Sequence, residues 1–318
     1  MRILIVQTSA LGDVVHALPV ISDVRREFPK LAIDWCIDEK YAAIPHLHPA
    51  VDRILPVAAQ RWRQQMFSPS TWREMRDFRR TLRAVDYDAV LDLQGTLYSA
   101  LLAQQACGPT CGYDAAAAHN RLAARFYDAT FIIPKIVHPL ERKRWLAAAV
   151  LELPLETPLD YGINAAPLSA DWLPAQPYII FLPAACHNGN LWPEIQWIEL
   201  GQALQARGNT IVLPAETGEE RTRATPIATA IPDAIVAPPL GIEAMAGLLA
   251  GAVGIIGTNT GLTHLASALG RPVVTILGTA DPEFNGVLGA APFRNLSGQG
   301  TIADLNAVLN AFLTCTRP

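Results

Sequence analysis

Lysine is absent from the second half of the 318-residue chain. Residues 161–318 contain 6 Lys+Arg against 11 Asp+Glu, whereas residues 1–160 contain 19 against 18, so the halves carry −5 and +1 and sum to −4. A phosphate bound by the second half must therefore rely on backbone N–H groups, helix N-termini, hydroxyls, histidine or a few arginines. The net negative charge and the lack of a nucleic-acid-binding motif argue against a nucleic-acid partner.

The sequence also lacks segments that direct a chain into or across a membrane. Met1 and Arg2 lead into only four apolar residues, which is too short for the apolar part of a secretory signal. The longest apolar tract, residues 247–257, falls far below the roughly 20 residues that span a bilayer. We therefore expect a cytosolic protein.

Common motifs of nucleotide and metal sites are missing as well. No G-x-G-x-x-G or G-x-x-x-x-G-K-[ST] follows a strand-like run, which weakens the case for a dehydrogenase or a P-loop enzyme. The five cysteines are scattered, and the close pair Cys107 and Cys111 has no second pair or histidine pattern beside it. We expect reduced, structural thiols and no metal.

Apolar runs that alternate with helical patterns indicate the fold. Continuous hydrophobicity is typical of strands buried on both faces of a parallel sheet, and the alternation implies β-α-β units. Two such series predict an α/β protein with two Rossmann-like domains, residues 1–165 and 166–318, with the break in a Pro- and Ala-rich stretch at 156–177. A last helical segment, 303–313, could pack on either domain. The expected strands begin at Arg2, Ala32, Arg53, Asp88, Tyr178, Asn209, Ala234, Val253 and Pro272.

The loop after the first strand holds a suggestive carboxylate. The stretch QTSALGDVVHALP, residues 7–19, places Asp13 where a helix begins. Ligands bind at the carboxyl ends of strands in open α/β sheets, and the positive end of a helix favours an ionised carboxylate. Asp13 could therefore accept a proton from a hydroxyl nucleophile. The alternative is an ordinary N-cap, and we expect His16, one turn later, to face the core.

Two loops of the second half could hold an anion. The run TNTG, residues 258–261, follows a strand and opens a helix whose free N–H groups can bind a pyrophosphate, with His264 within reach. A capped helix with a buried histidine explains this run equally well. The stretch GTADPEF, residues 278–284, adds Thr279 as a further phosphate contact or is simply an Asp-Pro turn.

One stretch is strongly basic. From Trp72 onward apolar side chains recur at steps of three or four residues while arginines fill the remaining arc, which predicts an amphipathic helix with a cationic face. Such a face is usually only solvated, but its concentration in one half also fits an acidic acceptor or an anionic membrane surface. The apolar positions are Trp72, Met75, Phe78, Leu82 and Val85, and the basic ones are Arg73, Arg76, Arg80 and Arg83.

Together these motifs resemble the lipopolysaccharide heptosyltransferases, most closely members of the heptosyltransferase I kind. The similarity spans nearly the whole chain and rests on ILIVQTSALGDVVHALP, IDWCIDEKYAAIPHLHPAVDRILPVAAQRWR, YDAVLDLQG, HPLERKR, LWPEIQW and TNTGLTHLASALGRPVVTILGTADP, in the family's order. It implies a GT-B fold, in which two Rossmann-like domains with parallel sheets face each other across a cleft. It also implies an inverting, metal-independent transfer of heptose from ADP-heptose to the Kdo region of the lipid A-linked inner core.

The resemblance further implies where the protein acts and which residues form its catalytic, donor and acceptor sites. It places the chain in lipopolysaccharide biosynthesis on the cytoplasmic face of the inner membrane, an anionic surface that the basic helix would approach without inserting. Asp13 would be the general base. The donor site would include Ala185, Cys186, Asn190, Glu220, Leu240, Asn259, Thr260, Gly261 and His264, together with Thr279. The acceptor site would include Gln7, Ser9, Gly12, Arg61, Arg63, Tyr98, His119, His138 and Arg142.

Several family charges are absent from these positions. Lysine is common in the family at the positions of Gln7, Tyr98 and Asn190, arginine at that of His119, aspartate at that of Asn259, and hydroxyl residues at those of Ala185 and Cys186. Loss of a charge-assisted contact to an anion costs more than loss of a neutral hydrogen bond. A different donor or acceptor, or a non-catalytic binding protein, is therefore an alternative, although retention of Asp13 favours an enzyme. A nucleotide-sugar epimerase would leave the acceptor motifs unexplained, and the oligomeric state stays open.

Overall fold

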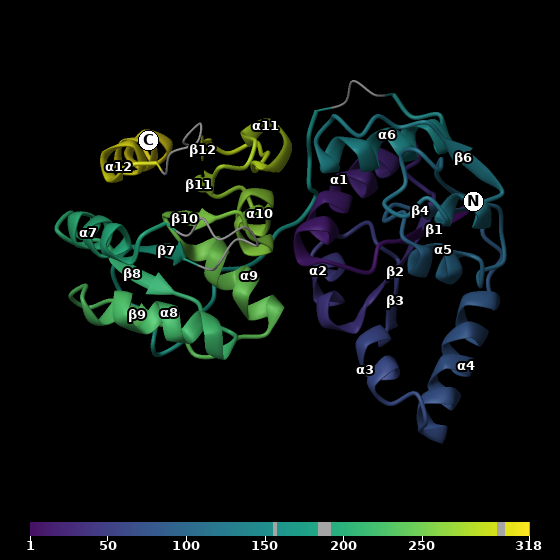
Figure 1. Ribbon diagram of the computed structural model, residues 1–318, viewed down its shortest axis with the longest axis horizontal. Coiled ribbons are helices and arrows are strands. Elements are labelled where there is room, and N and C mark those ends of the chain that lie inside the picture. Colours follow the sequence, from purple (N-terminus) through teal and green to yellow (C-terminus); the bar gives the residue numbers. More distant parts are fainter. Residues whose placement is uncertain (155–157, 184–191, 298–302, 318) are drawn as a thin grey trace. The chain divides into compact units, whose positions relative to one another are not determined.

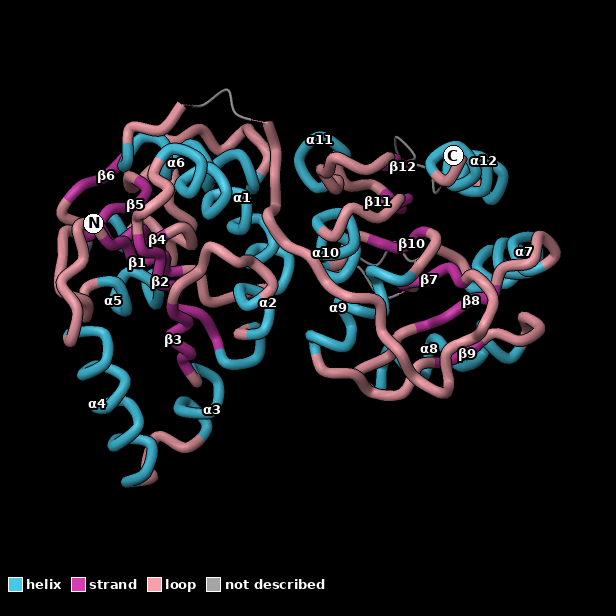
Figure 2. Tube along the Cα trace, turned by 180° about the vertical axis from the view of Figure 1, so that it is seen from behind, coloured by secondary structure: helices cyan, strands magenta, loops and turns pink. Residues whose placement is uncertain are grey.

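The computed structural model describes residues 1–154, 158–183, 192–297 and 303–317 of the chain. The chain divides into two compact units, Met1–Ile163 and Asn164–Pro318. Within the described residues, each unit is built around one six-stranded parallel sheet with helices packed on it (Figures 1 and 2).

The first sheet is made of short strands that are apolar on both faces. Its strands are β1 (Arg2–Val6), β2 (Ala32–Asp38), β3 (Arg53–Val57), β4 (Ala89–Asp92), β5 (Thr110–Tyr113) and β6 (Ala129–Phe131). They lie in the order β3-β2-β1-β4-β5-β6, which is the 3-2-1-4-5-6 order of a Rossmann fold. Asp34 is the fully buried acid of β2, and it is satisfied by Arg2 Nη1 at 2.9 Å and Tyr87 Oη at 2.9 Å.

Helices cover this sheet, and two of them are joined by a buried ion pair. In α1 (Leu11–Glu27), Asp23 accepts a hydrogen bond of 2.7 Å from Arg144 Nε of α6 (Pro139–Leu151), and both side chains are buried. This pair ties α1 to α6 beneath the first strand's loop. The remaining helical elements of the unit are η1 (Glu39–Tyr41), α2 (Ala43–His46), α3 (Ala59–Gln64), α4 (Pro69–Arg83), α5 (Leu97–Ala103) and η2 (Ala123–Phe126).

The second unit repeats the same strand order. Its strands are β7 (Tyr178–Leu182), β8 (Thr210–Leu213), β9 (Ile235–Val236), β10 (Gly254–Thr258), β11 (Val273–Gly278) and β12 (Phe293–Ser297). They lie in the order β12-β11-β10-β7-β8-β9, again the Rossmann arrangement, so the predicted α/β class with two Rossmann-like domains is confirmed. The helices are α7 (Glu194–Gln205), α8 (Gly218–Thr229), α9 (Ile242–Gly251), α10 (Gly261–Ala268), α11 (Pro282–Asn285) and α12 (Leu305–Cys315).

Aromatic side chains fill the core of the second unit. The ring centroids of Trp192 and Trp197 lie 4.9 Å apart and perpendicular, and those of Phe181 and Trp197 lie 5.0 Å apart. The C-terminal helix α12 packs on α7, β11 and β12 of this unit, where Phe312 is buried in the same core. The sequence alone did not decide on which of the two domains this helix packs.

Every strand expected from the sequence overlaps an observed one, but three observed strands were missed. These are β5, β6 and β12. Two of them, β6 and β12, are edge strands, and β6 is largely exposed, so neither shows a continuous apolar run. β5 is only four residues long and contains Gly112, where a Cβ would lie 2.4 Å from the Tyr127 ring. Short strands with polar or glycine positions give no clear hydrophobic signal.

Candidate functional site

Asp13 lies at the carboxyl end of β1, in the first turn of α1. The N-cap of this helix is Ala10, which makes no side-chain cap, so Asp13 is not the N-cap that the alternative required. Lys143 of α6 instead donates a hydrogen bond from Nζ to Asp13 Oδ1 over 3.2 Å. The lysine side chain is 7% exposed and that of Asp13 is 48% exposed. A solvent-accessible carboxylate is therefore held by a buried ammonium group.

The loop after β4 is fixed beside this ion pair. Burial raises the pKa of the Asp92 carboxyl, while hydrogen bonds to it act in the opposite direction. Its donors are Tyr127 Oη at 2.6 Å, Ser99 Oγ at 2.8 Å, and the N–H groups of Gln94 at 2.9 Å and Gly95 at 3.1 Å. Gly95 has a φ of 67°, and a Cβ there would lie 2.9 Å from the Tyr113 ring, so glycine is required. The Leu93 carbonyl of this loop lies 3.5 Å from Lys143 Nζ.

The loops after β1 and β4 are also joined directly. Thr8 donates from both its N–H (2.9 Å) and its Oγ1 (2.8 Å) to Oε1 of Gln94. The strand order reverses between β1 and β4, and ligands of open α/β sheets bind at such a switch point. Asp13 therefore stands where this fold class places its ligands.

Two residues of the implied acceptor site, His138 and Arg142, lie at the start of α6. His138 caps α6 through Nδ1, which accepts the N–H of Leu140, and its ring packs edge-on against His16 at 5.1 Å between centroids. His16 is buried, as we expected. Arg142 donates from Nη2 to the Ala117 carbonyl at 2.6 Å and lies over the Tyr113 ring, 5.0 Å from its centroid.

The other implied acceptor residues differ in how far they reach solvent. Gln7 is fully buried, and its Nε2 donates to the Ser9 carbonyl at 2.6 Å, so this amide braces the loop after β1. Gly12 is half-buried and His119 is exposed. Tyr98 is 40% exposed in the first turn of α5, where partial burial raises its pKa, with Cys36 and Asp38 adding to the shift.

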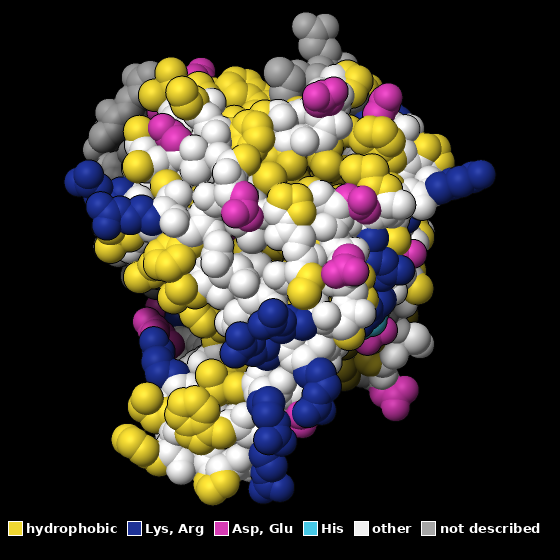
Figure 3. Space-filling model, turned by 90° about the vertical axis from the view of Figure 1, so that its right-hand side faces the viewer, with side chains coloured by type: hydrophobic (Ala, Val, Ile, Leu, Met, Phe, Trp, Pro, Cys, Tyr) yellow, Lys and Arg dark blue, Asp and Glu magenta, His cyan; other side chains and the backbone are white. Residues whose placement is uncertain are grey.

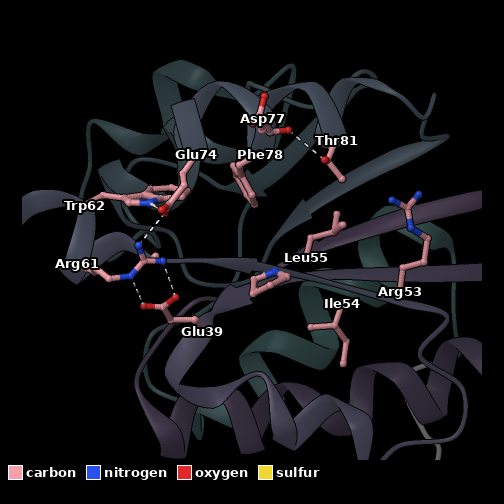
Figure 4. A pocket seen from close by; sticks show the side chains of 12 residues that line it. Glu39, Arg53, Ile54, Leu55, Arg61, Trp62, Glu74, Asp77, Phe78 and Thr81 are labelled. Carbon is pink, nitrogen blue, oxygen red and sulfur yellow. Dashed lines mark hydrogen bonds and ion pairs between the residues drawn. The ribbon is translucent and has the colours of Figure 1, made fainter. Parts of the chain in front are cut away.

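Arg61 lines a pocket of about 670 Å³ between β3, α3 and α4 (Figure 4). Its guanidinium is already paired on two sides, with Glu39 through Nε at 3.2 Å and Nη2 at 3.0 Å, and with Glu74 through Nη1 at 2.7 Å. Trp62 Nε1 also donates to Glu74 at 2.9 Å, and the hydrogen bonds from Trp62 and Arg61 lower the pKa of Glu74. These bonds use three of the five N–H donors of the guanidinium, so Arg61 binds two carboxylates and keeps two further donors. Arg63, on the same helix, is exposed.

The basic helix is present as α4, but its apolar stripe is buried only in part. Leu82 is buried, and Phe78 packs edge-on against Trp62 at 5.6 Å between centroids. Trp72 is 60% and Met75 38% exposed, so these two apolar positions of the predicted amphipathic helix face solvent. Figures 1 and 2 show that the N-terminal turns of α4 run beyond the sheet of the first unit.

In the second unit, α10 follows β10 at the corresponding switch point. Thr260 caps the helix, accepting from the Thr263 N–H at 3.4 Å and meeting Thr263 Oγ1 at 3.0 Å. His264 is buried, and its Nε2 lies 2.9 Å from Asn259 Oδ1. These are the features of the capped-helix alternative. The N–H groups of residues 261–262 have no carbonyl partner among the described residues, so the helix start still offers two backbone donors.

The next loop lies at the same edge of the sheet, because β11 pairs with β10. Thr279 is exposed directly after β11. Asp281 caps the short helix α11 by accepting from the Glu283 N–H at 2.9 Å, which is the Asp-Pro turn of the alternative. The Asp-Pro turn is therefore observed, and the phosphate contact of Thr279 stays a prediction.

The remaining implied donor residues lie elsewhere on this edge or outside the described residues. Glu220 closes a capping box on α8, since its Oε2 accepts from the N–H groups of Glu216 (2.9 Å) and Thr217 (3.0 Å). The sequence pattern T-x-x-E at residues 217–220 indicates such a capping box, so the Glu220 carboxylate already has backbone partners. Leu240 is half-buried in the loop after β9. Ala185, Cys186 and Asn190 lie outside the described residues.

The described ranges show neither a metal-binding cluster nor a membrane-spanning helix. They contain no group of three or more His, Cys, Asp or Glu side chains placed to hold a metal ion. None of their helices is long and apolar enough to cross a membrane.

Comparison with known proteins defines the class. The model of glycosyltransferase family 9 (heptosyltransferase) matches residues 75–304. Lipopolysaccharide heptosyltransferase 1 of Pseudomonas aeruginosa is 40% identical over 91% of this chain and 82% of its own length, and that of Escherichia coli K12 is 39% identical over 93% and 95%. The structure of E. coli heptosyltransferase WaaC with ADP superposes with a TM-score of 0.90 at 37% identity over 100% of both chains. A second structure of that enzyme, with ADP-2-deoxy-2-fluoro heptose, gives 0.84 at 37% identity over 98% of both.

The protein is therefore a GT-B-type glycosyltransferase. It belongs to glycosyltransferase family 9, the heptosyltransferases, which confirms the resemblance inferred from the motifs.

Sequence reasoning missed Lys143. It falls within the stretch HPLERKR, of which only His138 and Arg142 were singled out. The contact with Asp13 joins residues 130 positions apart, so no local spacing could reveal it. The signal that was available is a lysine beside the apolar positions of α6, because a lysine buried in a helix usually has a partner.

Proposed function

We propose that the protein transfers heptose from ADP-heptose to the Kdo region of the lipid A-linked inner core in lipopolysaccharide biosynthesis. The single observation that carries this proposal is the Asp13–Lys143 pair, a carboxylate that is open to solvent and anchored at the switch point of the first unit. The relatives named heptosyltransferase 1, and the structures of one such enzyme with ADP and an ADP-heptose analogue, support the choice of donor.

Asp13 acts as the general base. Its carboxylate takes the proton of an acceptor hydroxyl as that oxygen attacks the anomeric carbon, and ADP leaves with the electron pair of the broken bond. One such displacement inverts the anomeric configuration and needs no second carboxylate. Lys143 acts as a positioning residue, because its buried ammonium holds Oδ1 of a carboxylate whose side chain is 48% exposed.

The diphosphate is held by the second unit without lysine. The first N–H groups of α10, the hydroxyl of Thr279 and the positive end of the helix supply the donors, while Thr260 holds the helix start as its cap. The His264–Asn259 contact fixes the side chains at this helix start. Because these groups can neutralise the developing charge on ADP, we infer that transfer proceeds without a metal ion, which EDTA treatment of the reaction tests.

Calorimetry and an ADP-release assay test the proposal together. We expect ADP-heptose to bind, and ADP to be released only when Kdo-lipid A is also present. Asp13→Ala should bind the donor normally but lose ~10²- to 10⁴-fold in turnover, the usual contribution of a general base. Asp171→Ala, which removes an exposed carboxylate of the second unit, is the matched control and should behave as the unmodified chain.

The outcomes separate the parts of the proposal. Failure to bind any nucleotide sugar would contradict the transferase and leave a binding protein. Binding of another nucleotide sugar but not of ADP-heptose would overturn the donor alone. Turnover that survives Asp13→Ala would overturn only the assigned base.

The acceptor is lipid-linked, so we also propose that the protein works at the cytoplasmic face of the inner membrane. The basic arginines of α4 support this placement, because anionic headgroups attract a cationic helix. Recovery of the protein with the membrane fraction at low salt, and its release at high salt, tests the placement.

A further inference from the structure

The end of the α3–α4 hairpin exposes a group of large apolar side chains. Within ten residues, Met66 is 50% exposed, Phe67 93%, Trp72 60% and Met75 38%. Single exposed apolar residues are ordinary, but a cluster on one projecting element marks an interaction surface. Figures 1 and 2 show this hairpin running beyond the sheet of the first unit.

Arginines surround the same cluster. Residues 59–83 contain seven arginines and two acids, a net charge of +5 in a protein of net charge −4, so the rest of the chain sums to −9. Both acids are already paired, Glu74 with Arg61 and Asp77 with Arg80. Within the described ranges, four arginines of this segment have no carboxylate partner, namely Arg63, Arg73, Arg79 and Arg83. Figure 3 shows hydrophobic and basic side chains next to one another over this end of the unit.

Helical spacing places aromatic and basic groups on one face of α4. Trp72, Arg76, Arg79 and Arg83 are separated by four, three and four residues, so their side chains project in nearly the same direction. Arg76 meets Asp77 over 3.9 Å, whereas Arg79 and Arg83 have no carboxylate partner among the described residues. An aromatic ring beside two uncompensated arginines fits poorly in a protein core. It suits the boundary of a lipid bilayer, where the ring enters the acyl edge and the guanidinium groups stay with phosphates.

We propose that the α3–α4 hairpin is a membrane anchor that inserts Met66, Phe67 and Trp72 into the interfacial layer of an anionic phospholipid bilayer. The inference rests on the proposed function, because a lipid-linked acceptor brings the protein to a bilayer. It replaces the earlier expectation that the basic helix approaches the surface without inserting. The unpaired arginines select a bilayer with anionic headgroups over a protein partner, which would have to bring a matching set of carboxylates.

The base of the hairpin holds the anchor in shape. Glu74 of α4 accepts hydrogen bonds from Arg61 at 2.7 Å and from Trp62 at 2.9 Å, both on α3 (Figure 4). Phe78 packs on the Trp62 ring below them. The two helices are thereby joined before any lipid is met, so insertion does not have to order the hairpin first.

Vesicle flotation of the full chain tests the anchor, with vesicles of phosphatidylcholine alone and of equal parts phosphatidylcholine and phosphatidylglycerol. We expect tight binding to the anionic vesicles only. Phe67→Ser should weaken that binding about tenfold or more, since a buried phenylalanine contributes about that factor. Arg79→Gln with Arg83→Gln should weaken it roughly fivefold per arginine. Ile195→Ser, an exposed apolar position of the second unit at 58%, is the matched control and should bind as the unmodified chain.

Insertion is distinguished from adsorption by a brominated-lipid quenching measurement. Bromine atoms near the headgroup should quench tryptophan fluorescence on binding, and Trp72→Phe should lose most of that quenching. Equal binding of the Phe67→Ser variant and the unmodified chain, or no loss of quenching in Trp72→Phe, would overturn the anchor. Equal binding to neutral and anionic vesicles would overturn the role of the arginines.

Failure of the anchor can be told from failure of the transferase. Phe67→Ser should retain full turnover with a deacylated, water-soluble Kdo acceptor and lose turnover with the same acceptor embedded in vesicles. If the unmodified chain glycosylates both acceptors without binding vesicles, the anchor is wrong and the transferase stands. If it binds vesicles but transfers to neither acceptor, the anchor stands and the proposed function is wrong.

Discussion

Replacement of Lys143 by methionine tests the ion pair on which the proposed mechanism depends. Methionine keeps nearly the length of the lysine side chain but removes the ammonium that donates to Asp13 over 3.2 Å. A hydrogen bond to a charged group contributes about 1.5–3 kcal/mol, and because Asp13 is 48% exposed we take the lower part of that range, about 1.5–2 kcal/mol. If this energy is used to orient the base in the transition state, kcat should fall roughly 10- to 30-fold.

The stability of the same variant should change little. The ammonium of Lys143 is buried, and replacing a buried charge by an apolar group of similar volume is often neutral. Asp13, which loses its partner, can be solvated by water. We therefore expect an unfolding free energy within about 1 kcal/mol of that of the unmodified chain.

The assay is a steady-state ADP-release measurement with the donor and acceptor varied separately. A positioning role predicts a lower kcat with an unchanged KM for ADP-heptose, because in the proposed mechanism Lys143 acts through Asp13 and does not bind the donor. Lys143→Arg, which keeps the charge, should recover part of the rate. An unchanged kcat in Lys143→Met would refute the reasoning. So would a lower rate that is fully accounted for by a smaller folded fraction, as measured by urea unfolding.

Three further predictions follow from other contacts. Arg144→Met, one residue along α6, should have the opposite signature. The kcat of the folded protein should be unchanged and the free energy of unfolding in urea lowered by about 3 kcal/mol, because the buried Asp23 carboxylate loses its ion pair with Arg144. Burial lowers the pKa of His48 to about 4 from its ordinary 6.5, so the unfolded chain binds more protons and stability should fall by up to about 3 kcal/mol as the pH drops from 6.5 to 4. Urea titrations across that range measure the slope, and His48→Gln should flatten it; an equal slope in the variant would show that another group is responsible. Gly95→Ala should lower the unfolding free energy by more than 1 kcal/mol and reduce kcat, because the glycine has a φ of 67° and no room for a Cβ. A variant with the stability and rate of the unmodified chain would contradict the importance of this loop.

The architecture could be predicted because it follows from local patterns. Continuous apolar runs such as RILIV gave the buried parallel strands, and the rule that ligands bind at the carboxyl ends of such strands directed attention to Asp13 and to residues 258–261. The missed strands lie mostly at sheet edges or contain glycine, where burial on both faces no longer shapes the sequence.

Side-chain pairing could not be predicted, because it joins segments far apart in the chain. Lys143 meets Asp13 across 130 positions, and Arg61 is engaged by Glu39 and Glu74 from two other elements. The exposure of Trp72 could not be predicted from the sequence either. Its spacing fits an apolar stripe, and only the placement of α4 beyond the sheet leaves it in solvent.

Mass spectrometry of the acceptor tests the central claim most directly. Kdo-lipid A is incubated with ADP-heptose and either the unmodified chain or Asp13→Asn, and the mass of the acceptor is read before and after. The account predicts the gain of one heptose with the unmodified chain and an unchanged acceptor with the variant over the same time. An unmodified acceptor in both reactions, or the same product in both at the same rate, would contradict it.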